Sequence, residues 1–174
     1  MKIIKVKNQK GFSLIEMMVV VVILGLIVLG LVTFFTGGAK SWVAGQSQLE
    51  AQRNARQAMD QMVREIRETD YIEPNSTSSS IYFHTPFDGS ISYSLIIRDL
   101  KRGSNPIINN IQSLNFKYFD NLEPPVEIIP PLTSETASKI SKVNIDLKVD
   151  VDKDSKPDIT LNTDVNLRNY GLLE

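Results

Sequence analysis

The chain has 174 residues with one histidine and no cysteine, and its 19 basic and 20 acidic residues give a formal net charge of −1. The lack of cysteine excludes disulfides, thiolate metal sites and a cysteine nucleophile, and the single histidine excludes a histidine-rich zinc site. The near balance of charge excludes a whole-chain field that attracts nucleic acid.

A basic leader precedes a long apolar run. The leader carries four lysines: Lys2, Lys5, Lys7 and Lys10. The 23 residues from Met17 to Ala39 carry no charge, and a helix of ~1.5 Å rise per residue makes them long enough to cross a bilayer core of ~30 Å. Lysines beside a membrane segment favour the cytoplasmic side. We therefore predict a single-pass membrane protein with a cytoplasmic N-terminus and an extracytoplasmic head.

Residues 40–72 have the pattern of an amphipathic helix. Apolar side chains recur there at three- and four-residue spacing, at Leu49, Ala55, Met59, Met62, Val63 and Ile66. Charged residues fill the other faces, and the spacing of Asp60 and Arg64 favours an i,i+4 ion pair. Pro74 and the serine-rich run after it end the pattern. One nearly continuous helix from Phe12 to Glu73 is predicted.

After this helix the apolar pattern changes to a period of two, which is typical of strands. The predicted strands are 80–84, 90–97, 111–119, 142–151 and 158–168. The turn-rich sequence VDVDKDSKPD joins the last two into a hairpin. Residues 120–139 contain four prolines and are predicted to form a long loop without regular structure.

Together these patterns predict an α+β fold in which the apolar stripe of the helix packs on an antiparallel sheet. The predicted organisation has four parts: a leader at 1–11, a transmembrane helix at 12–38, an amphipathic helix at 39–73 and a β-sheet head domain at 74–174.

The segment GFSLIEMMVVVVILGLI at 11–27 follows the basic leader with a glycine, a phenylalanine and a glutamate four residues later, before a long apolar run. In these features it resembles the class III signal peptide of type IV prepilins and pseudopilins. The resemblance implies a pilin-like fold and a membrane-embedded peptidase that cuts between Gly11 and Phe12 and methylates the new amine on Phe12. It also implies that the subunit, held in membrane lipid at first, enters a filament of other major and minor pilins or pseudopilins.

Three further segments resemble PilW/PulJ-type minor pilins and J-type minor pseudopilins. They are RNARQAMDQMVREIRETDY at 53–71, IQSLNFKYFD at 111–120 and VNLRN at 165–169. This resemblance implies a minor subunit of a type IV pilus, type II secretion or competence-type filament. Many pilins carry a cysteine pair near the C-terminus, and this chain has none.

Glu16 places a carboxylate directly before the long apolar run. In a filament of parallel apolar helices it can pair with the Phe12 amine of a neighbouring subunit, and such pairing is much stronger in low dielectric than in water. A second interpretation is a capping box, because Ser13-Leu14-Ile15-Glu16 has the S-x-x-E spacing of a helix start. The two interpretations are partly compatible.

Two other classes of protein compete with a filament subunit. An ordinary signal-anchored or secreted extracytoplasmic binding protein would use Gly37-Gly38-Ala39 as a small-residue cleavage site, but the apolar segment exceeds the usual ~7–15 residues. An enzyme would have to use His84 as a base. No Ser/His/Asp spacing, paired carboxylates or phosphate loop accompanies it, so we expect no catalysis and no cofactor apart from calcium.

Two charged clusters suggest ligands. Four aspartates of the hairpin turn have a spacing that can bring oxygens onto calcium: Asp150, Asp152, Asp154 and Asp158. The turn departs from an EF-hand at two positions, because Ser155 stands where an EF-hand has glycine and Leu161 stands where it has glutamate. The alternative is a solvated turn that binds no ion. Six basic residues offer a patch for DNA: Arg53, Arg56, Arg64, Arg67, Lys101 and Arg102. Without aromatic stacking residues beside them, nucleic acid is not an expected partner.

Overall fold

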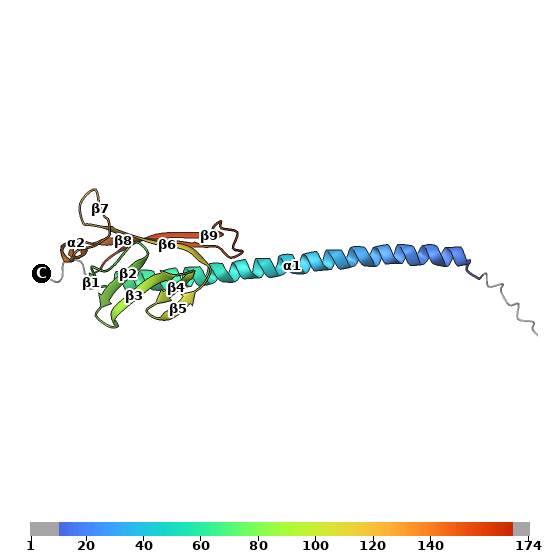
Figure 1. Cartoon of the computed structure of the whole chain (residues 1–174), viewed down its shortest axis with the longest axis horizontal. Helices are drawn as coiled ribbons and strands as arrows, with labels where there is room; N and C mark the ends of the chain where they lie inside the picture. Colours follow the sequence, from blue (N-terminus) through green and yellow to red (C-terminus); the bar gives the residue numbers. More distant parts are fainter. Residues whose placement is uncertain (1–10, 169–174) are drawn as a thin grey trace, which may run out of the picture. The chain divides into compact units, whose positions relative to one another are not determined.

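The computed structural model describes residues 11–168, so most of the predicted leader lies outside the described residues. The chain divides into two compact units, Met1–Gly45 and Gln46–Glu174. A long helix, α1 (Leu14–Arg67), passes through both, and its C-terminal part packs against antiparallel strands. The predicted α+β, pilin-like fold is confirmed (Figure 1).

Helix α1 ends at Arg67 rather than at the predicted Glu73. The chain turns at Thr69, which is buried and whose hydroxyl donates to the backbone oxygens of Tyr71 at 3.2 Å and His84 at 2.8 Å. Tyr71 then pairs with His84 in a sheet. Pairing with a strand distant in sequence therefore overrides the local helical pattern.

The head contains two antiparallel sheets in place of the one predicted. The first has the strand order β1-β2-β3-β4-β5, with β1 at Tyr71–Ile72, β2 at Ser80–Thr85, β3 at Gly89–Ile96, β4 at Asp99–Arg102 and β5 at Asn105–Ile108. The second has the order β7-β6-β8-β9, with β6 at Ile111–Phe119, β7 at Glu127–Ile128, β8 at Lys142–Val149 and β9 at Ile159–Asn166. The predicted hairpin of 142–151 and 158–168 is confirmed as β8 and β9.

The prediction that 120–139 has no regular structure was wrong. Strand β7 lies in this segment and pairs with β6. A short helix, α2 (Ser134–Ser138), begins with a capping box in which the Thr133 and Thr136 hydroxyls accept each other's backbone N–H at 3.2 and 2.8 Å. The prolines lie around these elements rather than inside the helix.

One hydrophobic core joins α1 to both sheets. Strand β8 shows the alternation most clearly, with Val143, Ile145, Leu147 and Val149 all buried. Each such side chain contributes about 1.5–3 kcal/mol of transfer free energy. Helix α1 contributes five buried side chains: Ala55, Ala58, Met59, Met62 and Ile66.

Two predictions about α1 were wrong. Leu49, placed on the packed stripe, is 65% exposed because the buried face of α1 begins only at Ala55. Asp60 and Arg64 form no ion pair among the described residues, and both are exposed. At the surface, the cost of ordering two long side chains offsets most of the attraction.

Candidate functional site

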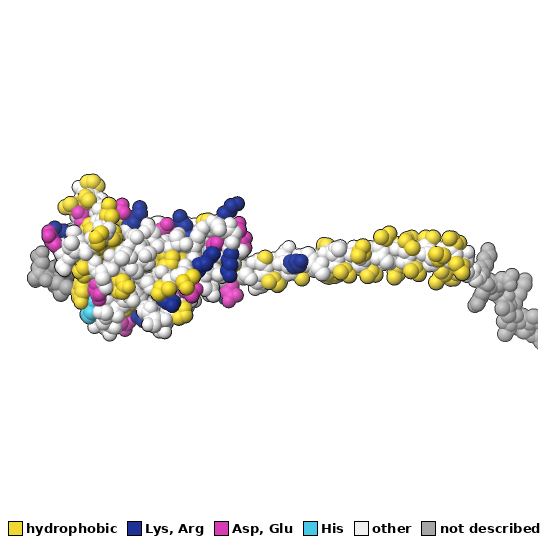
Figure 2. All heavy atoms as spheres, viewed as in Figure 1, with side chains coloured by type: hydrophobic (Ala, Val, Ile, Leu, Met, Phe, Trp, Pro, Cys, Tyr) yellow, Lys and Arg dark blue, Asp and Glu magenta, His cyan; other side chains and the backbone are white. Residues whose placement is uncertain are grey.

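The N-terminal part of α1 is an apolar helix whose described side chains are exposed. Every residue from Gly11 to Glu50 is exposed, including large side chains such as Phe34 at 75% and Phe35 at 68%. Figure 2 shows hydrophobic side chains around this part of the helix. Among the described residues, α1 is the one helix that is long and apolar enough to cross a membrane. An apolar surface of this extent needs lipid or other apolar helices around it.

The polar side chains within the apolar run are satisfied by their own helix. The Thr33 hydroxyl donates to the Gly30 oxygen at 2.8 Å, and the Thr36 hydroxyl donates to the Val32 oxygen at 2.9 Å. These bonds to the preceding turn leave neither hydroxyl in need of water. Lipid or other apolar helices can therefore surround the run without leaving either hydroxyl donor without a hydrogen-bond acceptor.

The predicted processing residues lie at the start of this helix. Gly11 and Phe12 precede the first helical residue, and the backbone N–H groups of Glu16 and Met17 donate to the Ser13 oxygen at 3.1 and 3.2 Å. No side-chain bond of the predicted capping box between Ser13 and Glu16 forms among the described residues. The Glu16 carboxylate is thus exposed and has no partner within the described chain.

Gly11 is not required by packing. A Cβ atom built on it would meet nothing within 4 Å. A requirement for glycine at this position must therefore come from a molecule that acts on the chain, such as a peptidase that approaches the backbone closely.

These features coincide with a known family signature. Residues 6–32 match the prokaryotic N-terminal methylation motif. The match covers Gly11, Phe12, Glu16 and most of the apolar run, from Met17 to Val32. A search of curated proteins finds no match for the chain.

The methylation motif belongs to prokaryotic prepilin-like proteins, and together with the fold it supports a processed, type IV pilin-like subunit. It implies a prepilin peptidase and other pilins as partners, and it points to a structural subunit rather than an enzyme. With its single long apolar helix, the chain fits a single-pass inner-membrane anchor. The competing prediction of cleavage after residues 37–39 is not favoured, because these residues lie within α1.

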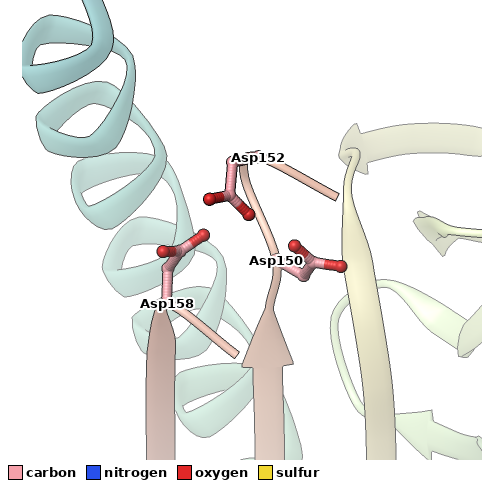
Figure 3. Close-up of side chains that lie close together, drawn as sticks. All are labelled: Asp150, Asp152 and Asp158. Carbon is pink, nitrogen blue, oxygen red and sulfur yellow. The ribbon is translucent and has the colours of Figure 1, made fainter. Parts of the chain in front are cut away.

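The acidic hairpin brings three of the four predicted aspartates together (Figure 3). One carboxylate oxygen from each of Asp150, Asp152 and Asp158 lies within 4.8 Å of the others. Asp154 is not a member of this group, and its Oδ1 accepts the Lys156 N–H at 2.8 Å instead. Asp150 follows β8 directly and Asp158 directly precedes β9, so the register of the hairpin sets their approach.

Asp150 is the buried member of the group. Its side chain is 1% exposed, and Oδ2 accepts a hydrogen bond from Arg98 Nη2 at 2.8 Å. This hydrogen bond from Arg98 is the main cause that lowers the pKa of Asp150. Arg98 follows Ile97, a β-branched residue with a φ of 63° in the turn between β3 and β4. Such a φ is unfavourable for isoleucine. The tight turn at Ile97 directly precedes Arg98, whose side chain binds Asp150.

His84 lies in β2, between β1 and β3 of the first sheet. Its Nδ1 lies 3.2 Å from Asp70 Oδ2, and its ring stacks on Tyr71 with centroids 5.3 Å apart. Among the described residues no serine, threonine or cysteine side chain is hydrogen-bonded to the ring. The contacts attach β2 to the segment after α1, and they do not resemble a nucleophile and its base.

A polar network between α1 and the first sheet was not predicted. Glu65 Oε2 accepts hydrogen bonds from the Tyr93 hydroxyl at 2.8 Å and from Arg102 Nε at 2.9 Å, while Gln61 donates to Oε1 at 3.0 Å. Burial raises the pKa of Glu65, but the hydrogen bonds from Arg102, Gln61 and Tyr93 outweigh it and leave that pKa below its ordinary value. Burial, and then the bond to Glu65, raise the pKa of Tyr93.

This network also removes Arg102 from the basic patch considered for DNA. Arg102 contacts both Glu65 and Asp88. The α1 members of the patch remain exposed. The six basic residues therefore do not act as one free surface.

Proposed function

We propose that the chain is a minor pilin or pseudopilin of the J type, a structural subunit that assembles into a type IV pilus, type II secretion or competence-type filament. The observation that carries this proposal is the uncovered apolar part of α1, preceded by the methylation motif. The resemblance of residues 53–71, 111–120 and 165–169 to J-type subunits supports the minor role.

Processing changes the chemistry of the helix start. Hydrolysis of the Gly11–Phe12 peptide bond leaves a carboxylate on Gly11 and a free amine on Phe12. The peptidase then transfers a methyl group from a methyl donor to this amine, which loses one proton in exchange and stays basic, so that it is cationic at neutral pH. The scissile bond precedes the first helical residue, Leu14, so the peptidase can reach it without unwinding α1.

Assembly then gives Glu16 a partner. When the apolar helices of neighbouring subunits pack together, an unpaired carboxylate among them is costly, and the Phe12 amine of a neighbour relieves that cost. The pair would also fix the axial register of adjacent helices, as single polar residues do in coiled coils. The lysines of the leader orient the chain in the inner membrane with its head outside the cytoplasm before assembly.

Glu16→Ala tests this proposal. We expect the variant to be cut and methylated normally but to be largely absent from sheared filament fractions. The matched control is Ser13→Ala, which removes the other side chain of the capping-box interpretation and should leave incorporation unchanged. Normal incorporation of Glu16→Ala would contradict the pairing, and equal loss in both variants would assign the effect to the helix start.

A further inference from the structure

The tip of the β8–β9 hairpin has the geometry of a cation site. We propose that it binds one calcium ion through Asp150, Asp152 and Asp158. The proposal concerns the head alone, so it stands or falls independently of cleavage and filament assembly.

Distance is the first argument. The three ligand oxygens lie within 4.8 Å of one another. Calcium–oxygen bonds of about 2.3–2.6 Å allow two oxygens on one ion to be up to about 5 Å apart. Each pair of these oxygens therefore lies within the span of one calcium ion. Magnesium demands near-ideal octahedral geometry and usually keeps several waters, so a group of three carboxylates suits calcium better.

The second and independent argument is a buried oxygen without a partner. Asp150 is 1% exposed, and its Oδ1 has no hydrogen-bond partner. Its Oδ2 is already used by Arg98 Nη2 and by the Ser155 N–H at 3.3 Å. Arg98 Nε is also buried and does not bond to Oδ1. A buried carboxylate oxygen is normally satisfied, so Oδ1 lacks a ligand that a cation would supply.

The direction of the side chains agrees with this assignment. Figure 3 shows the carboxylates of Asp150, Asp152 and Asp158 around one space, with an oxygen of each turned toward it. Asp158 Oδ2 accepts the Val151 N–H at 2.7 Å, and Asp152 Oδ1 accepts the Asp154 N–H at 3.1 Å. One oxygen of each exposed aspartate therefore remains for the ion.

The negative net charge of the hairpin turn favours the binding of a divalent cation. Residues 150–158 carry four aspartates and two lysines, and Arg98 contacts only one of the three clustered carboxylates. Asp152 and Asp158 are exposed, so water can complete a shell of 6–8 oxygens. The arrangement differs from an EF-hand, because Leu161 occupies the glutamate position and pairs with Leu147 in the sheet.

The test uses the full chain in detergent micelles, treated with chelator and then titrated with calcium chloride alone. We expect a dissociation constant of about 0.1–1 mM, as in extracellular calcium modules, and a rise in the Tm of the head of about 5 °C at saturating calcium. Asp152→Asn and Asp158→Asn should each weaken binding about tenfold or more.

The matched control is Asp154→Asn, which removes the same charge from the same turn outside the cluster. It should change the affinity less than about threefold, because screened charges in this loop act weakly at a distance. Absence of binding at 10-fold above the expected constant would overturn the proposal. So would an equal loss in Asp154→Asn, or magnesium binding as tight as calcium binding.

Discussion

The two ends of α1 are both helical, but their side chains differ in surroundings and in polarity. From its start to Glu50 every side chain is exposed, and the residues from Met17 to Ala39 are almost all apolar. Beyond Ala55 one face of the helix is buried by the chain's own sheets, and the other faces are polar. The second region is complete within one chain, whereas the first needs a surrounding that the chain does not contain. This difference assigns folding to the C-terminal part of α1 and assembly to the N-terminal part.

The largest expected effect separates the two regions directly. Met62 is fully buried in the head core, and Met62→Ala should lower the free energy of unfolding of the head by about 3 kcal/mol, because it removes apolar contacts and leaves a cavity. Thermal or denaturant unfolding of the full chain in detergent measures this change.

Leu26→Ala is the matched control for Met62→Ala in the same helix. Leu26 is 65% exposed, so the head should unfold as in the wild type, within about 0.5 kcal/mol. A loss of head stability comparable with that of Met62→Ala would show that the apolar part of α1 is covered by the head after all.

A medium effect is expected from Glu65→Gln. Glu65 has a side-chain exposure of 13% and holds Tyr93 and Arg102, so the variant should lose about 1–3 kcal/mol at neutral pH. The folded pKa of Glu65 lies below its ordinary value of 4.5. The carboxylate therefore stabilises the fold above pH ~4.5, and this contribution is lost as the pH falls through the folded pKa.

The pH dependence gives the sharper reading of the Glu65 network. Stability measured from pH 7 downwards should fall less steeply below pH ~4.5 in Glu65→Gln than in the wild type, because the variant has no carboxylate to protonate there. Parallel curves for the two proteins would show that Glu65 is not held by the network.

The smallest effect is expected on the outward face of the packed part of α1. Asp60 is exposed and makes no ion pair with Arg64 among the described residues. Asp60→Asn should therefore change the free energy of unfolding by less than about 0.5 kcal/mol. A larger loss, measured by the same unfolding experiment, would mean that this face is also covered.

Sequence patterns predict the regions where neighbours along the chain decide the structure. The alternation of Val143, Ile145, Leu147 and Val149 predicts β8, and the turn after it predicts the hairpin. Strands β4 and β5 give no such signal, because both are short, β4 is mostly charged and β5 contains Pro106. The division into two sheets depends on pairings between distant strands, which periodicity does not contain.

The candidate sites show the same division. The start of the apolar run could be predicted from local features alone, with Gly11, Phe12 and Glu16 in one short motif. In sequence Glu65 looks like any solvated helix residue. Only its contacts with Tyr93 and Arg102 from the sheet show that it is half-buried. Likewise, spacing does not distinguish Asp154 from the three clustered aspartates.

The N-terminus of the protein recovered from cells tests the central claim most directly. Mass spectrometry of the mature chain should find Phe12 as the first residue with one methyl group on its amine. Gly11→Val, which meets no packing obstacle in the fold, should leave the chain uncut with a normally folded head. Recovery of wild-type protein that begins at Lys40, or with an unmodified leader in the assembled filament, would contradict the account.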